Sequence, residues 1–475
     1  WGYTEIAPKM LSLFSMFLTT ICIFLIVRKS SISSFCTILL IWPFLSVTIH
    51  NQANEANIEV FLLPFLFFYW YLLSAYKETG KAQLWYAAVG ILSLSFLLKQ
   101  VTLPFALLAF TFMPLKDLKN AKLMLIRCLG FAGTVLAIHL IVYASTVGLE
   151  ALFNQFTQVM GHGSKAKSLG SGEQVSLPIR FLKTLFMFPF HDGLIRIFPV
   201  TALALTATVL TALKEKWKSL PLIACWLMAI IAVILPGSDS HHYYIIFIFP
   251  LLLSFCALVN LGQYKIIFLI VTGVSLLFQT AFFFHKNDIV SGNRWYVICL
   301  IVLAVVALIL PLIIMKKKID CSCHGLITPF LCLVFLGLHT SYYYLSKNKI
   351  QISWQKYGDW FYGNRYVGEQ LKIMGIHDKK IYVNGSNAGI YFYSNNLPAI
   401  PYHASYTLGL GYVTEEKFLD LLNQNKPEYI ILPAPTTNVK GFVQWTDAHY
   451  DLYNIVPGTR NKNVEGIKIL RLKTK

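Results

Sequence analysis

The sequence contains few charged residues. They make up 13% of its 475 residues, whereas about a quarter of the residues in soluble globular domains are charged. Apolar residues make up 56%, and nearly all of this excess lies before residue 346. The composition excludes a soluble globular protein and predicts an α-helical polytopic membrane protein, followed by a small polar domain.

Several other features are also lacking. There is no internal repeat and no low-complexity run, so neither a solenoid nor an obviously duplicated transporter is indicated. The sequence begins with Trp1, and no signal-peptide pattern stands at its start, so we expect that an N-terminal part is missing. Cysteine is absent after residue 346, but a domain of about 130 residues can fold without disulfides.

Runs of about 20 apolar residues predict about twelve membrane-spanning helices. They cover residues 10–27, 33–49, 57–75, 83–98, 101–115, 124–146, 194–213, 219–236, 243–261, 265–284, 296–315 and 325–344. The segments 83–98 and 101–115 are short and are interrupted by Lys99-Gln100, so they can form a tight hairpin that does not fully cross the membrane.

Basic residues mark one face of the predicted membrane domain. The net charge is +18, and alternating the helices places on one side the basic residues around 28, 77, 116–122, 214–218, 265 and 316–318. The positive-inside rule makes this side cytoplasmic, and it explains the charge without a nucleic-acid partner. The other face carries most acidic residues, so we expect chemistry that needs carboxylates to lie there.

Two domains are expected. Residues 1–345 form the transmembrane domain, with a long external loop at 147–193 whose second half, 176–190, is either a membrane-interface segment or a plain connector. Residues 346–475 form an exoplasmic α/β domain, with strands at 380–384, 429–432 and 466–470 and a helix at 415–423.

Three polar clusters interrupt the apolar pattern at external helix ends. Asn57 and Glu59 stand at the start of one helix, Lys99-Gln100 between two others, and His242-Tyr243 at the start of a fourth. Ionisable groups at membrane depth are costly and are therefore candidate sites. Each cluster also has an interpretation without a function. The first can be a polar helix cap, the lysine of the second can simply reach water, and the third can be an interfacial His/Tyr belt.

Metal binding is weakly indicated. Cys321-Ser322-Cys323-His324 has the residue types of half a zinc site, but it has no second pair of ligands nearby. We therefore assign no metal site, and the sequence leaves open whether a divalent metal takes part.

Four stretches resemble glycosyltransferases of the GT-C architecture, specifically the protein-mannosyltransferase and aminoarabinose-transferase type, family 39 and its bacterial relatives. The segment 57–64 is similar to the family's Asn-x-Glu-x-Phe segment, 96–100 to its Lys-Gln break, and 242–251 to its His-Tyr turn before a proline-containing helix. Residues 381–385 and 390–394 are similar to the start of its exoplasmic domain. Aminoarabinose-type members have thirteen helices, the number reached here if one helix precedes Trp1.

The resemblance implies inverting transfer of a sugar from a polyprenyl-phosphate donor to a lipid, glycan or protein acceptor at the exoplasmic face, in the bacterial inner membrane. It implies no firm cofactor, and it places the catalytic Asp before Trp1. Asn57, Glu59, Lys99, Gln100, His242 and Tyr243 are the expected substrate-binding residues. A lipid-linked polysaccharide ligase or polymerase, or a flippase or transporter of a polyprenyl-linked substrate, remains an alternative.

Overall fold

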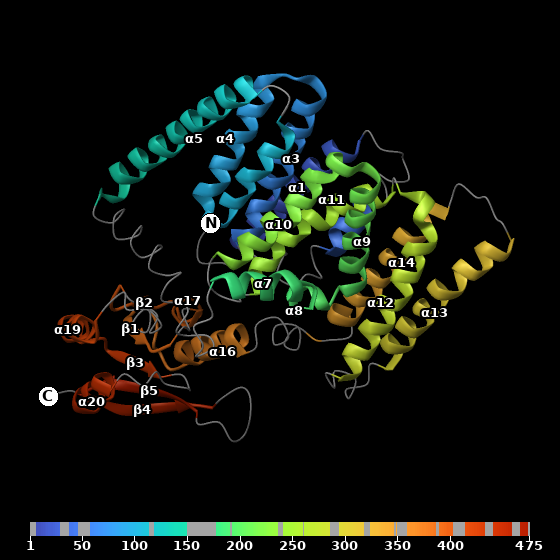
Figure 1. Cartoon of the computed structure of the whole chain (residues 1–475). Helices are drawn as coiled ribbons and strands as arrows, with labels where there is room; N and C mark the ends of the chain where they lie inside the picture. Colours follow the sequence, from blue (N-terminus) through green and yellow to red (C-terminus); the bar gives the residue numbers. More distant parts are fainter. Residues whose placement is uncertain are drawn as a thin grey trace. The chain divides into compact units, whose positions relative to one another are not determined.

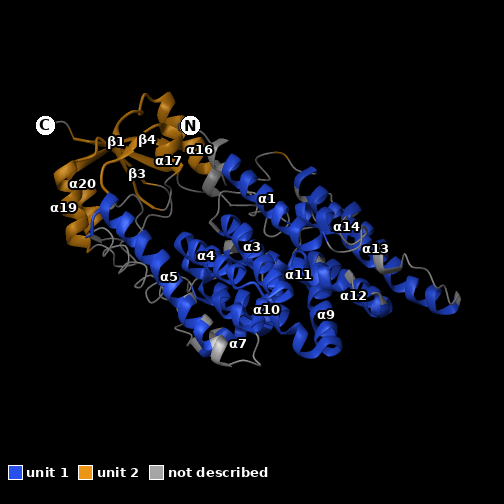
Figure 2. Ribbon diagram, turned by 90° about the horizontal axis from the view of Figure 1, so that it is seen from above, with its two compact units in different colours: residues 1, 3–156, 175–346 blue, residues 2, 157–174, 347–475 orange. Residues whose placement is uncertain are grey.

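The computed structural model divides the chain into two compact units (Figures 1 and 2). Of the residues that the structure describes, those up to 345 belong to the helical unit and those from 348 onward belong to the sheet unit. The structure describes residues 6–28, 38–45, 58–113, 118–149, 177–190, 192–235, 241–259, 261–285, 294–317, 324–345, 348, 359–385, 389–401, 414–432, 440–457 and 466–473.

The described part of the helical unit has helices in each of the segments that the apolar runs predict, although one segment is described only in part. Its elements are α1 (Ile6–Val27), α3 (Ile58–Thr79), α4 (Ala82–Leu98), η1 (Gln100–Phe112), α5 (Leu118–Val147), α7 (Leu177–Met187), η3 (Phe188–Phe190), α8 (Asp192–Ile195), α9 (Phe198–Glu215), η4 (Lys216–Ser219), α10 (Leu220–Ile234), η5 (His241–Phe247), α11 (Ile248–Val259), η6 (Gly262–Tyr264), α12 (Lys265–His285), α13 (Arg294–Lys317), α14 (His324–Thr340) and the π-helical turn η7 (Ser341–Leu345). The expected segment 33–49 is described only at 38–45, where it is helical.

Six stretches of the described chain are long and apolar enough, by length and composition, to cross a membrane. They are Lys9–Val27, Glu59–Thr79, Leu125–Thr146, Phe198–Ile234, Lys265–Phe283 and Trp295–Lys316. The stretch Phe198–Ile234 contains two of the expected helices, α9 and α10. Other expected segments form shorter apolar helices, among them α4, η1 and the helix Tyr243–Leu258.

The predicted hairpin at Lys99 is present. Helix α4 and η1 pack against each other, and Lys99 joins them in extended backbone conformation. Because η1 is a 3₁₀ helix that rises about 2.0 Å per residue, its 13 residues span about 26 Å. The 17 residues of α4 span the same distance at 1.5 Å per residue. The two arms therefore match in length, and both are somewhat shorter than a bilayer core of about 30 Å.

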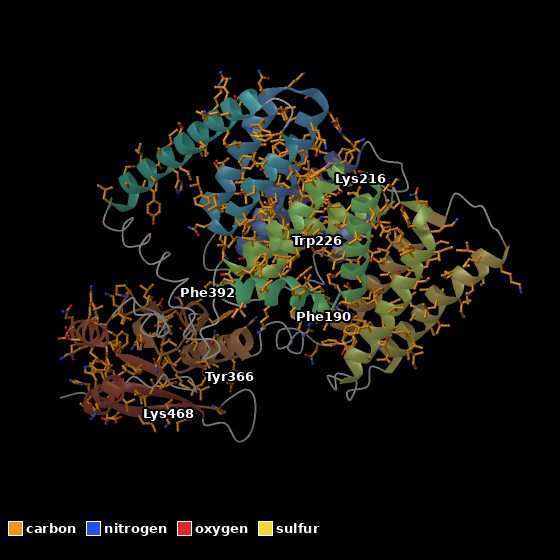
Figure 3. All side chains as sticks on the ribbon, in the orientation of Figure 1. Phe190, Lys216, Trp226, Tyr366, Phe392 and Lys468 are labelled. Carbon is orange, nitrogen blue, oxygen red and sulfur yellow. The ribbon has the colours of Figure 1, made fainter. Side chains whose placement is uncertain are left out.

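Three helices in the middle of the helical unit share one buried polar contact. The indole Nε1 of Trp226 in α10 donates to Thr208 Oγ1 of α9 and to Ser254 Oγ of α11, both at 3.0 Å. The two hydroxyls lie 2.9 Å apart, and Figure 3 shows the Trp226 side chain inside the helical unit. Such a contact between apolar helices fixes their register, because a slipped helix would leave the buried indole without acceptors.

Part of the expected loop at 147–193 is helical. Residues 150–176 lie outside the described chain, but 177–187 form helix α7. This helix packs against α10, and the Phe188 ring that follows it stacks on Phe247 at 5.2 Å. Ile179, Leu182 and Phe186 are exposed on α7. A helix that buries only one side fits the membrane-interface segment that the sequence allowed at 176–190, and its place at a membrane stays a prediction.

The sheet unit has a five-stranded mixed sheet in the order β2-β1-β3-β5-β4. The strands are β1 (Lys380–Val383), β2 (Leu397–Pro398), β3 (Tyr429–Leu432), β4 (Tyr450–Val456) and β5 (Ile467–Leu472). Strand β1 pairs in parallel with β2 and β3, whereas β5 pairs antiparallel with β3 and β4. The strands predicted at 380–384, 429–432 and 466–470 are confirmed within one or two residues.

Helices cover both faces of this sheet (Figure 1). Apolar side chains of α16 (Asp359–Ile373) and α17 (Gly389–Ser394) form one buried cluster with the strands. Those of α19 (Glu415–Asn425) and α20 (Lys440–His449) form a second cluster with other strand residues. Helix α19 matches the helix expected at 415–423, and the two separate clusters make this unit a three-layer α/β domain.

Candidate functional site

Glu59 lies in the first turn of α3, and its carboxylate is buried. Its side chain is only 2% exposed, and its Oε1 forms an ion pair and hydrogen bond with the Nζ of Lys99. Lys99 belongs to the turn between α4 and η1, and its side chain is 19% exposed. The two charges are 40 residues apart in the sequence, and the α4–η1 hairpin brings them together by packing along α3.

Tyr243 completes this cluster from a third part of the chain. It lies in η5, which packs against α3, and the Lys99 Nζ stands 4.3 Å from the centroid of the Tyr243 ring. An ammonium group at this distance is attracted by the negative face of the ring. The structure therefore brings Glu59, Lys99 and Tyr243 together. From their common place at external helix ends, Glu59, Lys99 and His242 were expected to converge, and the position of the His242 side chain stays a prediction. We call these three residues the buried Lys–Glu–Tyr cluster.

The other expected site residues are less fully described. Gln100 is the first residue of η1, directly beside Lys99, and it is exposed. His242 lies in η5 next to Tyr243, but its side chain is outside the described part of the structure. Asn57 also falls outside the described residues, which begin again at Ile58. The structure thus leaves the roles of these three residues as predictions.

The apolar surroundings of the buried Lys–Glu–Tyr cluster make its stability depend on the balance of its own charges. A carboxylate and an ammonium between apolar helices are stable only as a pair, because neither can be well hydrated. A lysine ammonium has three N–H donors, so Lys99 can donate to an anionic oxygen while it stays near Glu59. The cluster can therefore hold an anionic group at the edge of an apolar helical unit.

The opposite end of α3 carries different cations. Lys77 is exposed in the last turn, with its Nζ 5.8 Å from the centroid of the Phe112 ring at the end of η1. Arg28, just after α1, donates from Nη2 to the Tyr71 hydroxyl at 3.4 Å. The positive-inside rule predicts that these two cations share one side of a membrane. Lys99 lies at the other end of α3, beside an acidic residue.

A contact that the sequence analysis missed holds α3 next to Glu59. Pro64 lies inside α3 and has no N–H, so it cannot donate to the carbonyl of Val60, four residues earlier. The hydroxyl of Ser15 in α1 donates to this carbonyl instead, at 2.8 Å and in buried surroundings. A proline inside an apolar helix was the available signal, but the sequence does not show which neighbouring helix supplies the missing donor.

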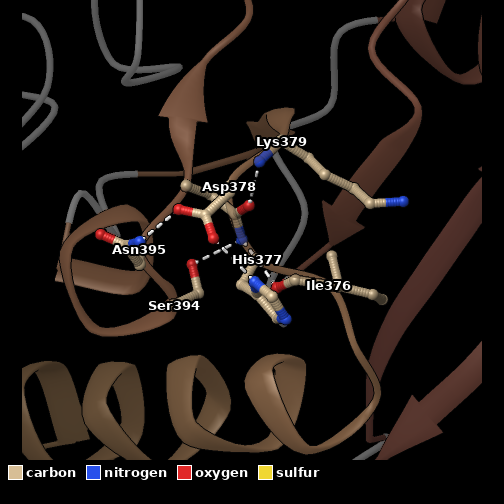
Figure 4. A network of polar contacts seen from close by, with 7 residues as sticks. Ile376, His377, Asp378, Lys379, Ser394 and Asn395 are labelled. Carbon is tan, nitrogen blue, oxygen red and sulfur yellow. Dashed lines mark hydrogen bonds and ion pairs between the residues drawn. The ribbon is translucent and has the colours of Figure 1, made fainter.

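A second polar network lies in the sheet unit, and it is structural (Figure 4). Asp378 and Asn395 both have positive φ; the Asp378 amide donates to the Asn395 carbonyl at 2.9 Å, and the Asn395 amide donates back to the Asp378 carboxylate. His377 Nδ1 lies 2.8 Å from the same carboxylate. The two side chains of His377 and Asp378 are 51% and 68% exposed, so this network clamps two turns together at the surface.

Comparisons with known proteins assign no family. No protein-family model matches the chain, and no curated protein matches it significantly. Within the described residues, no group of three or more His, Cys, Asp or Glu side chains could hold a metal ion. The site therefore has to be interpreted from its own chemistry.

Proposed function

We propose that this protein is an integral membrane glycosyltransferase of GT-C architecture. It transfers a sugar, with inversion, from a polyprenyl-phosphate donor to a lipid, glycan or protein acceptor at the exoplasmic membrane face. The observation that carries the proposal is the buried Lys–Glu–Tyr cluster, in which a cation and an acid meet at one end of several apolar helices. Buried ionisable groups among apolar helices are functional candidates because their desolvation is costly.

Each residue of the cluster has a role that follows from its charge. Lys99 balances the phosphate of the donor, whose negative charge grows as the sugar leaves. Glu59 accepts hydrogen bonds from sugar hydroxyls, and Tyr243 fixes the position of the Lys99 ammonium. His242, the residue directly before Tyr243 in η5, is the proposed donor to a phosphate or hydroxyl oxygen.

The membrane placement belongs to the same proposal. The twelve expected segments form a multi-pass domain in the bacterial inner membrane, and the sheet unit lies on the periplasmic side. The long apolar stretches support the multi-pass arrangement, and the positions of Arg28 and Lys77 support the orientation. An isoprenoid tail would then find an apolar surface beside a cationic site for its phosphate, as a lipid-linked donor requires.

Topology can be tested by labelling cysteines with an impermeant thiol reagent in intact cells. Trp217 is 84% exposed in η4, between the two basic residues of a predicted cytoplasmic turn, and Lys468 is exposed on β5. Lys468→Cys should add labelling above the level of the native cysteines, and Trp217→Cys should add none. The reverse pattern would contradict the orientation.

Function is tested by substrate binding and consumption in lipid nanodiscs. We expect the protein to bind undecaprenyl phosphate more tightly than undecaprenol, because Lys99 recognises the phosphate. In a form of the protein that also carries the expected catalytic Asp, a polyprenyl-phosphate sugar should be consumed, and a nucleotide sugar should not. Equal binding of the phosphate and the alcohol, or direct use of a nucleotide sugar, would contradict the proposal.

A further inference from the structure

Ser12 differs from its neighbours on the buried face of α1. Ser12, Ser15 and Thr19 are all buried, and their spacing of three and four residues places them on one face of the helix. Ser15 donates to the Val60 carbonyl of α3, and Thr19 donates to the Ser15 carbonyl, each at 2.8 Å. The Ser12 hydroxyl is fully enclosed, yet it has no hydrogen-bond partner among the residues that the structure describes.

Two contacts fix where Ser12 stands along α3. Ser15 contacts the Val60 carbonyl, and the Cys22 Sγ lies 3.5 Å from the Pro64 carbonyl oxygen. Later residues of α1 therefore meet later residues of α3, so the two helices run in the same direction, side by side (Figure 1). Ser12 lies about one turn before Ser15, which places it level with the first turn of α3, the turn that carries Glu59.

Several other buried serine and threonine hydroxyls in this unit donate within their own helix. Ser254, Thr272 and Thr280 each donate to the carbonyl four residues earlier, at 2.7 to 2.8 Å. A buried hydroxyl without a partner loses its hydration and gains nothing in return. Its occurrence at Ser12, beside the turn of Glu59, points to a partner that arrives with the substrate.

We propose that Ser12 donates a hydrogen bond to a phosphate oxygen of the lipid donor that Lys99 binds. This inference rests on the proposed function and adds a binding residue from α1 to it. Lys99 attracts the anionic oxygen, and the Ser12 hydroxyl is a donor that no described residue uses. The fixed contact between Ser15 and Val60 holds α1 so that this donor stays at the level of Glu59.

The test compares Ser12→Ala with Ser15→Ala in nanodiscs, with undecaprenyl phosphate as the probe. Removing the unpartnered Ser12 hydroxyl should leave the melting temperature of the ligand-free protein unchanged or higher, but should weaken binding of the probe about tenfold. Ser12→Thr, which keeps the hydroxyl, should recover part of the affinity. Ser15→Ala should lower the melting temperature, because it leaves the Val60 carbonyl without a donor.

The outcomes separate this inference from the proposed function. If Lys99→Ala weakens binding but Ser12→Ala does not, the proposed function stands and the role of Ser12 is wrong. If Ser12→Ala lowers the melting temperature and leaves the affinity unchanged, its hydroxyl is structural, and the inference is overturned. If the wild-type protein does not bind undecaprenyl phosphate, the proposed function fails, and the role of Ser12 fails with it.

Discussion

Each of the two units contains a cluster of a lysine, a glutamate and a tyrosine. In the helical unit, Lys99 pairs with Glu59 and stands 4.3 Å from the Tyr243 ring centroid. In the sheet unit, Lys379 pairs with Glu428 at 2.6 Å and stands 5.1 Å from the Tyr429 ring centroid. Their exposure differs: 19% and 2% for the first lysine and acid, 31% and 45% for the second.

This difference shows that surroundings, rather than residue types, decide what such a cluster can do. The Lys379 cluster is formed by residues next to strands, and water screens its charges, so it contributes little beyond local order. The Lys99 cluster lies among apolar helices, so each charge depends on its partner. An incoming phosphate would change the balance of charge strongly at Lys99 and weakly at Lys379.

The largest effect is expected from Lys99→Ala. It leaves the buried Glu59 carboxylate without its cation, which should lower the free energy of unfolding by about 3 to 5 kcal/mol. Donor affinity should fall tenfold to a hundredfold, because a charge-assisted bond to phosphate is lost. Lys99→Arg should recover part of both, as measured by thermal unfolding and donor titration in nanodiscs. Unchanged donor use in both Lys99→Ala and Glu59→Ala would show that these residues only cap helices.

A buried neutral contact in the sheet unit should give the next largest effect. The Tyr391 hydroxyl accepts a hydrogen bond from the Val383 amide of β1 at 2.8 Å. Tyr391→Phe should therefore destabilise the sheet unit by about 1 to 2 kcal/mol, because a buried N–H loses its acceptor. Hydrogen exchange of the Val383 amide measures this directly. No change in exchange would mean that water replaces the lost acceptor.

Lys379→Ala is the matched control for Lys99→Ala. Because its ion pair with Glu428 is solvent-accessible, its loss should change the free energy of unfolding by less than about 1 kcal/mol. Donor affinity should stay at the wild-type value. A loss of affinity comparable to that of Lys99→Ala would break the distinction between the two clusters.

The smallest effect at neutral pH is expected from Tyr382→Phe. Burial raises the pKa of Tyr382, and its hydroxyl has no hydrogen-bond partner in the described part of the chain, so the substitution should leave stability unchanged or slightly higher. In the unfolded chain a tyrosine ionises near pH 10. The folded wild-type protein therefore loses stability as the pH rises above about 10, and the variant should lose less. Equal alkaline sensitivity in chemical denaturation at pH 10.5 would contradict this.

Much of the helical unit could be predicted from the sequence. Apolar runs placed its helices, and the hairpin at Lys99 could be expected because a cation and an amide interrupt two apolar segments. The meeting of Glu59 and Lys99 could be expected because polar residues stand out in such surroundings, whereas the third member expected from the sequence was His242 rather than Tyr243. The 3₁₀ geometry of η1 was not, since its residues would fit an α-helix equally well.

Contacts between distant residues could not be predicted in the same way. The bond from Ser15 to Val60 depends on how α1 packs against α3, and a serine in an apolar helix gives no sign of its partner. Strand β4 was missed because its residues 451–455 are all exposed, so it lacks the alternation of buried and exposed positions that marks a strand. For 176–190 the sequence left a membrane-interface segment and a plain connector open, and it could not show that α7 packs against α10.

The central claim is that the buried Lys–Glu–Tyr cluster binds the phosphate of a lipid-linked donor. It is tested most directly by the dissociation constant of undecaprenyl phosphate for the wild-type, Lys99→Ala and Lys379→Ala proteins in nanodiscs. We predict a tenfold to hundredfold increase for Lys99→Ala and no change for Lys379→Ala. Equal dissociation constants for all three proteins would contradict the claim.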